Sequence, residues 1–218
     1  TWASGPAPGA PIQAQAESTP ERVIRLIALP FRVLNGDERA GFLGHSLPEA
    51  IAVSLAGLRS LTVRSTLLAA RLAGGNQDPR HIAKEADVDM VLAGTMLCED
   101  NQAQVTAELI HAPSGTLVGT YVCNTKLDDL IQVQDSMVRG IVESLVLRLT
   151  EHEQRALDHN VPTSSRAYEF YLRANYVQRQ RTPESLAIAR DLYRECLDED
   201  PDYAPAWARL GRCYRTLE

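Results

Sequence analysis

Residues 207–214 constrain the fold of this 218-residue chain more than any other stretch, because they read W-x₂-L-G-x₂-Y. Trp207, Leu210 and Tyr214 recur at positions i, i+3 and i+7, which lie on one face of an α-helix. Gly211 has no side chain and would let a neighbouring helix approach closely. The pattern therefore predicts a helix that packs its apolar face against other helices.

This spacing is the first-helix signature of the tetratricopeptide repeat, a helix pair with a period of about 34 residues. Periodicity predicts further helices at 164–179 and 184–199, and the small, aromatic and proline places of the repeat are taken by Ala174, Ala189, Tyr193, Cys196 and Pro201. We therefore expect residues 151–218 to form an all-α tetratricopeptide helix-hairpin segment. A repeat buries its apolar face only against its neighbours, and the sequence ends at Glu218 before another helix can follow. We expect an excised part of a longer array, whose uncovered end would favour a homodimer.

Composition narrows the classes of function. The net charge of −6 and the lack of a long Lys/Arg cluster argue against a nucleic-acid binder. The sequence also has no run of about 18 apolar residues that would span a membrane. Residues 1–20, rich in Ala, Pro and Gly, predict a flexible linker.

The cysteines bear on metal binding and on the cellular compartment. Cys98, Cys123, Cys196 and Cys213 include no C-x-x-C pair, so we expect buried free thiols, no metal and no cofactor. Free thiols favour the cytoplasm, while the outer side of a membrane-tethered protein stays open.

Between the linker and the helical end, strand and helix patterns alternate. Apolar or alternating runs predict strands at 23–29, 61–64, 90–97, 102–109 and 116–124, with helices between the early strands and after the last one. The run at 90–97 is largely apolar, which is typical of a central strand. Turn-rich links at 99–101 and 113–115 predict antiparallel hairpins. Residues 21–150 are therefore expected to form an α/β domain, a mixed sheet with packed helices.

The first helix of this domain has a predicted start at Ser46. The residues Ser46-Leu-Pro-Glu49 match a capping box, in which the serine and glutamate side chains bond each other's backbone amides. Pro48 suits a first helical turn. Apolar side chains then recur with helical spacing at Leu47, Ile51, Leu55 and Leu58. This stripe predicts the face that packs on the sheet.

Several short tracts within residues 22–149 resemble one known family. They are Ile27-Ala-Leu29-Pro30-Phe31, Leu61-Thr-Val-Arg-Ser65, Val88-Asp89-Met-Val91-Leu92-Ala-Gly94 and Gln134-Asp135. In order and spacing they resemble the TolB amino-terminal-like domain, which lies in bacterial signalling proteins between a signalling module and tetratricopeptide repeats. The chain departs from the family at His45-Ser46 and Gly119. The resemblance implies a non-catalytic sensory or scaffolding domain, attached in its relatives to serine/threonine kinases, nucleotide cyclases or winged-helix regulators.

The candidate binding surface lies on the helical segment. Stacked repeats form a concave groove, and the groove positions in this register hold Tyr171, Asn175, Gln178, Arg179, Ala208, Arg212 and Arg215. This polar and basic set suits an acidic peptide or a chain-terminal carboxylate, held by charge-assisted hydrogen bonds. The alternative is that the same residues form an ordinary solvated face.

Familiar catalytic motifs are missing from the sequence, which has no G-x-S-x-G, no G-x₄-G-K-[ST] and no H-R-D or D-F-G tract. We therefore expect this chain not to be an enzyme, although the full-length protein could carry a kinase or cyclase domain. The favoured function is a sensory and protein-interaction segment of a larger bacterial signalling protein, with the repeats binding a protein or peptide. The alternative is a small-molecule sensor, in which the α/β domain holds a metabolite in a cleft beside the sheet.

Overall fold

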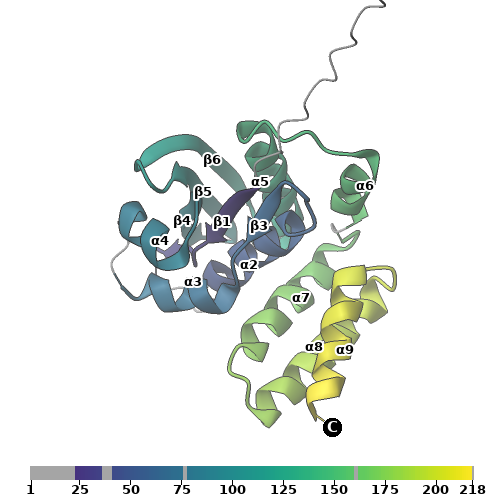
Figure 1. The fold of residues 1–218 in the computed structure, drawn as a ribbon. Helices are drawn as coiled ribbons and strands as arrows, with labels where there is room; N and C mark the ends of the chain where they lie inside the picture. The colour runs from purple at the N-terminus through teal and green to yellow at the C-terminus, as the bar shows by residue number, and fades with distance from the viewer. Residues whose placement is uncertain (1–22, 36–40, 76–77, 160–161, 218) are drawn as a thin grey trace, which may run out of the picture.

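The computed structural model of the chain describes residues 23–35, 41–75, 78–159 and 162–217. Figure 1 shows an α/β domain with helices around a β-sheet, and three helices, α7 to α9, beside it. The predicted linker at 1–20 lies outside the described residues. Within the described ranges, every helix is too short or too polar to cross a membrane.

The sheet of the described residues has six strands and follows the order β3-β1-β4-β5-β6. They are β1 (Ile24–Ala28), β2 (Arg32–Val33), β3 (Leu61–Val63), β4 (Met90–Glu99), β5 (Gln102–His111) and β6 (Thr116–Lys126). β1 is parallel to β3 and β4, while β4, β5 and β6 pair antiparallel. The two predicted hairpins and the central place of residues 90–97 are confirmed. β2, which the sequence patterns missed, pairs with β4.

Helices cover both faces of the sheet. They are α2 (Leu43–Leu55), α3 (Thr66–Ala73), α4 (Pro79–Ala86) and α5 (Leu130–Ser144), with a short 3₁₀ helix before α5 and α6 (Glu151–His159) after it. Side chains such as Leu26 and Leu92 pack with α2 and α5, whereas Ile27 and Val91 pack with α3 and α4. Neighbouring strand residues point to opposite faces, which gives the domain two apolar clusters.

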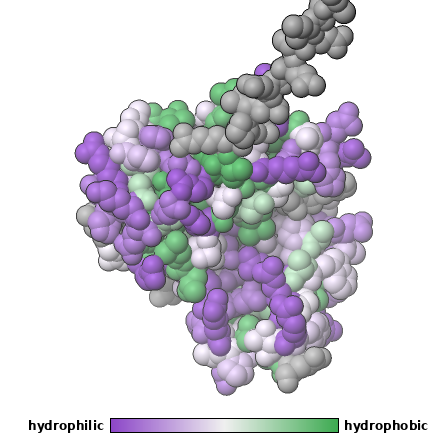
Figure 2. Space-filling model, viewed as in Figure 1, coloured by the Kyte–Doolittle hydropathy of each residue, from purple (hydrophilic) through white to green (hydrophobic). Residues whose placement is uncertain are grey.

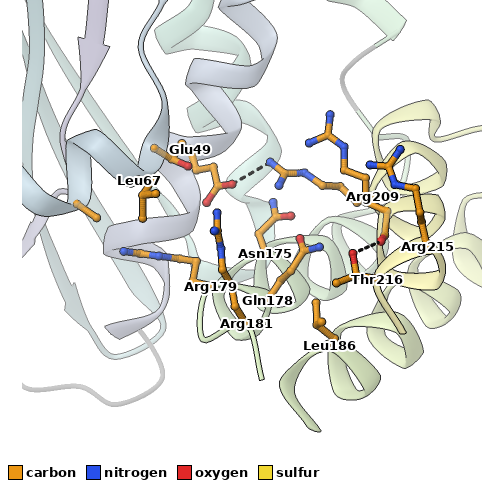
Figure 3. A pocket seen from close by; sticks show the side chains of 13 residues that line it. Glu49, Leu67, Asn175, Gln178, Arg179, Arg181, Leu186, Arg209, Arg215 and Thr216 are labelled. Atoms are coloured by element: carbon orange, nitrogen blue, oxygen red, sulfur yellow. Dashed lines mark hydrogen bonds and ion pairs between the residues drawn. The ribbon is translucent and has the colours of Figure 1, made fainter. Parts of the chain in front are cut away.

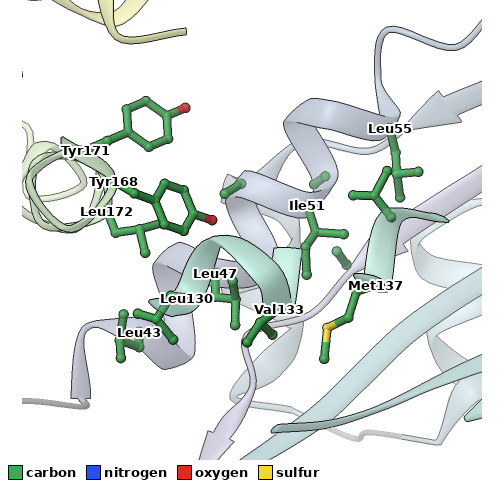
Figure 4. Close-up of a cluster of buried hydrophobic side chains, with 14 of the residues drawn as sticks. Leu43, Leu47, Ile51, Leu55, Leu130, Val133, Met137, Tyr168, Tyr171 and Leu172 are labelled. Carbon is green, nitrogen blue, oxygen red and sulfur yellow. The ribbon is translucent and has the colours of Figure 1, made fainter. Parts of the chain in front are cut away.

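The apolar stripe of α2 lies at the centre of the larger cluster, as predicted. Leu47, Ile51 and Leu55 are buried on α2, while Leu58, predicted as the last member of the stripe, is buried just after the helix ends. Figure 4 shows this face of α2 turned towards α5, with Val133 beside Leu47. The stripe therefore holds the two helices together on one face of the sheet.

The predicted start of α2 at Ser46 is wrong, because the helix begins one turn earlier. The Ser46 hydroxyl donates to the Phe42 carbonyl at 2.9 Å instead of capping the helix, and Pro48 lies inside the helix. Proline removes the amide that would bond the Gly44 carbonyl. The Phe31 amide bonds that carbonyl in its place, at 2.7 Å. A tertiary contact thus makes up for the missing helical bond, which no local pattern reveals.

The C-terminal part consists of α7 (Ser165–Gln178), α8 (Pro183–Glu199) and α9 (Ala204–Leu217), close to the predicted helices. Ser164 caps α7 and Thr182 caps α8, since each side chain accepts a backbone amide of the first turn. Ala174 and Ala189 are fully buried, as small side chains at close helix contacts should be. This part of the chain is α-helical throughout, apart from its turns.

One expectation for α9 is not met. Leu210 is buried, but Trp207 and Tyr214 are 56% and 45% exposed. A Cβ added at Gly211 would have no neighbour within 4 Å. We expected a neighbouring helix close to Gly211, but among the described residues no helix lies against it.

The cysteines are free thiols, and Cys98, Cys196 and Cys213 are buried while Cys123 is partly buried. Burial raises the pKa of Cys196 to about 12, so this group stays protonated. In the described part of the chain, no three His, Cys, Asp or Glu side chains are placed to hold a metal ion together.

α7 joins the two parts of the molecule through a buried polar chain. The Tyr168 hydroxyl donates to Gln134 Oε1 of α5, and Gln134 Nε2 donates to the Ser54 hydroxyl of α2 at 3.0 Å. Tyr168 and Leu172 of α7 face α2 and α5 across this contact (Figure 4). Apolar side chains of α7 belong to the same core as the sheet, so the two parts are packed together directly.

Candidate functional site

A cavity of about 440 Å³ lies where the α/β domain meets the helical segment (Figure 3). One side is formed by Glu49 of α2 and by Thr66 and Leu67 of α3. The other side comes from α7, α8 and α9, with the polar residues Asn175, Gln178, Arg179, Arg181, Arg209, Arg212 and Arg215. Figure 2 shows many hydrophilic side chains over the helical segment and along its boundary with the α/β domain. The volume is in the range of small-ligand sites, about 300–1,000 Å³.

Helix geometry explains why the arginines meet. Arg209, Arg212 and Arg215 follow one another at three-residue spacing on α9, so they lie on one side of that helix. Arg179 ends α7, and Arg181 follows it in a left-handed conformation with φ 55°, where the chain turns towards α8. The face of α9 and the α7–α8 turn thus present five guanidinium groups to one cavity.

Among the described residues, a single carboxylate lines the cavity with these five groups. Glu49 pairs with Arg209 at 2.8 Å, and both side chains are largely buried. The other four guanidinium groups belong to Arg179, Arg181, Arg212 and Arg215. None of them has a carboxylate of a described residue within 4.0 Å. The cavity is therefore positive, although the chain as a whole carries a net charge of −6.

Two amide side chains lie between the arginines. The Tyr193 hydroxyl donates to Asn175 Oδ1 at 2.7 Å and lies 3.0 Å from Gln178 Oε1. Burial raises the pKa of Tyr193, which keeps this hydroxyl protonated. Gln178 Nε2 lies 3.4 Å from Cys213 Sγ, whereas Asn175 Nδ2 is buried without a hydrogen bond to any described residue. A buried donor without a partner is costly, so a ligand oxygen near Asn175 would remove a penalty.

The cavity also lies at a characteristic place in the sheet. It lies beyond the carboxyl end of β3, beside α3, the helix that follows this strand. The first turn of α3, at Thr66, borders it and adds the positive end of a helix dipole. Crevices at such points of α/β sheets are common ligand sites.

Five of the six residues proposed from the sequence line this cavity, namely Asn175, Gln178, Arg179, Arg212 and Arg215. The sixth, Tyr171, is 1% exposed and packs against Tyr193 and Tyr203. Burial raises the pKa of Tyr171, so it is a neutral part of the core and not a contact residue. Ala208 is exposed and does not line the cavity.

Sequence reasoning missed several lining residues. Arg209 precedes Arg212 by one helical turn, so the same spacing argument could have found it. Arg181 lies in a turn, where no periodicity applies. Glu49 and Thr66 come from the other half of the chain, and only tertiary packing brings them to the cavity.

This arrangement offers positive charge and hydrogen-bond donors at close quarters. Planar guanidinium groups bind carboxylate and phosphate oxygens through pairs of N–H donors. The amide nitrogen of Asn175 and the hydroxyl of Thr66 can add further donors. The cavity therefore fits an anionic group.

Comparison with known proteins finds one informative relative. No family model matches the sequence. “Putative adenylate cyclase 3” of Rhizobium meliloti is 26% identical over 213 residues, which make up 97% of this chain and 36% of that protein. The chain thus spans about a third of the length of this curated relative.

Several solved structures are distantly similar. TolB from Acinetobacter baumannii superposes with a TM-score of 0.44 and 16% identity, over 57% of this chain and 28% of that one. Lipoprotein GNA1162 from Neisseria meningitidis superposes with a TM-score of 0.41 and 13% identity, over 58% of this chain and 99% of that one. PelC from Paraburkholderia phytofirmans superposes with a TM-score of 0.39 and 18% identity, over 67% of this chain and 96% of that one. These TM-scores are below 0.5, so the fold of the α/β domain is defined by its own strand order.

The comparison with the cyclase corrects one prediction. We expected the chain not to be an enzyme, yet nearly its whole length aligns with a protein that bears the name of an adenylate cyclase. The missing motifs belong to hydrolases, P-loop proteins and kinases. Their absence therefore says nothing about other enzyme classes. The prediction that the chain is not an enzyme was wrong, because it covered those classes as well.

Proposed function

We propose that this chain is a signalling segment of a bacterial protein of the nucleotide-cyclase class and that it binds an acidic segment of a partner protein in the junction cavity. In this proposal the first part is a TolB amino-terminal-like domain and the last part contains tetratricopeptide hairpins. The name of the relative supports the cyclase class. The recognition role rests on one observation: four guanidinium groups line a single cavity, and none of them has a carboxylate partner among the described residues.

The geometry supports a partner with more than one acidic side chain. Arg212 and Arg215 lie on α9. Arg179 and Arg181 lie at the α7–α8 turn, across the cavity from Arg215 (Figure 3). Two carboxylates of one segment could therefore be held from two sides. Each charge-assisted hydrogen bond contributes about 1.5–3 kcal/mol where water is largely excluded and less in an open site.

The test reverses two charges of the cavity without touching the core. Arg212 and Arg215 are exposed, so we expect Arg212→Glu/Arg215→Glu to change the free energy of unfolding by less than about 1 kcal/mol. Binding of a fluorescein-labelled decapeptide of alternating Asp and Glu, followed by anisotropy, should weaken at least about tenfold. Arg148→Glu/Arg194→Glu is the matched control, because it makes the same change of charge at exposed arginines outside the cavity.

Equal weakening in the two double variants would reject the cavity as the binding site, since it would show a response to net charge alone. A second measurement addresses the enzyme class. The natural full-length protein that contains this chain should convert ATP into cyclic AMP. Formation of cyclic AMP no faster than in a mock preparation would reject the cyclase assignment while leaving the peptide result untouched.

A small anionic metabolite is the second candidate occupant. The observation in its favour is the position of the cavity beyond the carboxyl end of β3, beside the first turn of α3. A panel of phosphorylated and dicarboxylic metabolites, screened by thermal shift, separates the two candidates. Stabilisation by several degrees with one compound, abolished by Arg212→Glu/Arg215→Glu, would favour the metabolite over the acidic segment.

A further inference from the structure

The sheet ends on one side in a long strand with an open edge. β6 is last in the order β3-β1-β4-β5-β6 and pairs with β5 alone among the described residues. β3 at the opposite edge has 3 residues, whereas β6 has 11. A short edge strand offers little backbone for pairing with another chain. The sheet is therefore protected at one edge and available at the other.

β6 also lacks the chemical protection that edge strands commonly carry. Residues 116–125 contain no charged residue and no proline. Leu117, Val118 and Val122 are exposed apolar side chains on this strand. The pairing with β5 shifts register near the start of β6, so the regular stretch is 119–125. An uncharged and regular edge of this kind is suited to accept a further strand.

A groove of about 670 Å³ runs along this edge, between β6 and α5. Residues 120–123 form its strand side, and Ser136 and Gly140 are small residues on its helix side. The Tyr121 hydroxyl donates to Ser144 Oγ at 2.8 Å, and a Cβ at Gly140 would come within 2.7 Å of the tyrosine ring. These contacts show that α5 lies directly over the edge strand and forms the roof of the groove.

We propose that β6 binds an extended segment of a partner protein, which adds to the sheet as a further strand under α5. Its backbone would pair with residues 119–125. Side chains that point to the roof would meet Ser136 and should be short. The alternate side chains would lie beside Val122 on the other face, where β-branched residues pack best.

A second copy of this chain fits the edge poorly. Two β6 strands that pair antiparallel would lie about 4.8 Å apart. Their α5 helices would then lie on the same face, and packed helices need about 8–10 Å between their axes. Since α5 already lies over β6, the two helices would collide. A segment without a covering helix of its own avoids this clash.

The test begins with ten-residue peptides selected by display on the intact chain. The library has Val, Ile, Thr or Tyr at alternate positions and Ser, Ala or Gly between them. We expect selected peptides to slow backbone amide exchange at residues 119–125, measured by NMR. Val122→Lys should weaken their binding about tenfold, because it places a charge beside the added strand. Leu117→Lys is the control, since Leu117 is 53% exposed against 59% for Val122 but does not line the groove.

Three results would overturn the proposal. They are the failure to select any peptide that binds below about 1 mM, protection that maps away from 119–125, and equal loss of binding in both lysine variants. Concentration-dependent protection of 119–125 without peptide would show a second copy as the occupant and would also overturn it. If Val122→Lys fails to fold, amide exchange in the unsubstituted chain with bound peptide still tests the proposal. The basic cavity lies elsewhere, so failure here is distinct from failure of the proposed function.

Discussion

Removing the carboxylate of Glu49 should destabilise the chain more than removing the entire ion pair to which it belongs. Glu49 of α2 is 7% exposed and Arg209 of α9 is 18% exposed, and they meet at 2.8 Å across the boundary between the two parts. Glu49→Leu would leave a largely buried guanidinium group without its counter-charge. In Glu49→Leu/Arg209→Met, no charge would be left behind.

The structure sets the expected magnitudes. Breaking a fully buried pair by removing one partner costs about 3–5 kcal/mol. Arg209 borders the cavity and keeps some contact with solvent, so we expect a loss of about 2–3 kcal/mol for Glu49→Leu. Arg209→Met should cost as much, because Glu49 is the more buried partner. The double variant should lose less than about 1.5 kcal/mol, since apolar side chains of similar size replace such pairs well.

Urea unfolding of the four proteins, followed by circular dichroism, measures these free energies. Glu169→Leu is the control, because Glu169 pairs with Arg173 on the open surface of α7, where such a pair contributes about 0–1 kcal/mol. The double-mutant cycle should give a coupling energy of at least about 2 kcal/mol. Additive losses, or a loss for Glu49→Leu no larger than for Glu169→Leu, would refute the view that this pair couples the two parts.

Three further predictions concern single sites. Glu153 accepts the backbone amides of Arg59 and Thr150, which lowers its pKa from 4.5 to about 2. The ionised Glu153 should therefore add about 2–3 kcal/mol to the free energy of unfolding above about pH 4.5, and this contribution should be lost as the pH falls towards 2. Glu153→Gln should flatten that part of an acid-unfolding curve. Gly44→Ala should cost about 1–3 kcal/mol in urea unfolding, because its Cβ would lie 2.6 Å from a backbone oxygen. Gly211→Ala should instead stabilise by about 0.5–1 kcal/mol, since that glycine lies in an exposed helix with open space around it; a loss there would show a close neighbour in solution.

Local patterns predicted most elements of the fold because local physics decides them. Ala103, Val105, Ala107 and Leu109 alternate with polar residues, and all four are buried in β5. The turn-rich links at 99–101 and 113–115 predicted the hairpins for the same reason. Helical periodicity likewise found α7 and α8 to within one residue at each end.

Features that depend on distant residues escaped the sequence. The start of α2 depends on Phe31, which bonds the carbonyl that Pro48 leaves free. The positive cavity was half predicted. Arg212 and Arg215 share the helix periodicity of α9, whereas Arg181 lies in a turn, and Glu49 reaches the arginines only through the packing of α2 against the helical segment. The open edge of β6 could be recognised only once the strand order was known.

The core that α7 shares with the α/β domain limits how this architecture can be rearranged. Repeat units can usually be exchanged or grafted, because each one contacts only its neighbours. Here a transplanted α7 would carry Tyr168 and Leu172 into water and leave Gln134 behind with an unpaired amide oxygen. Recombination between such proteins should therefore keep the α/β domain and α7 together, with crossover points only after α7.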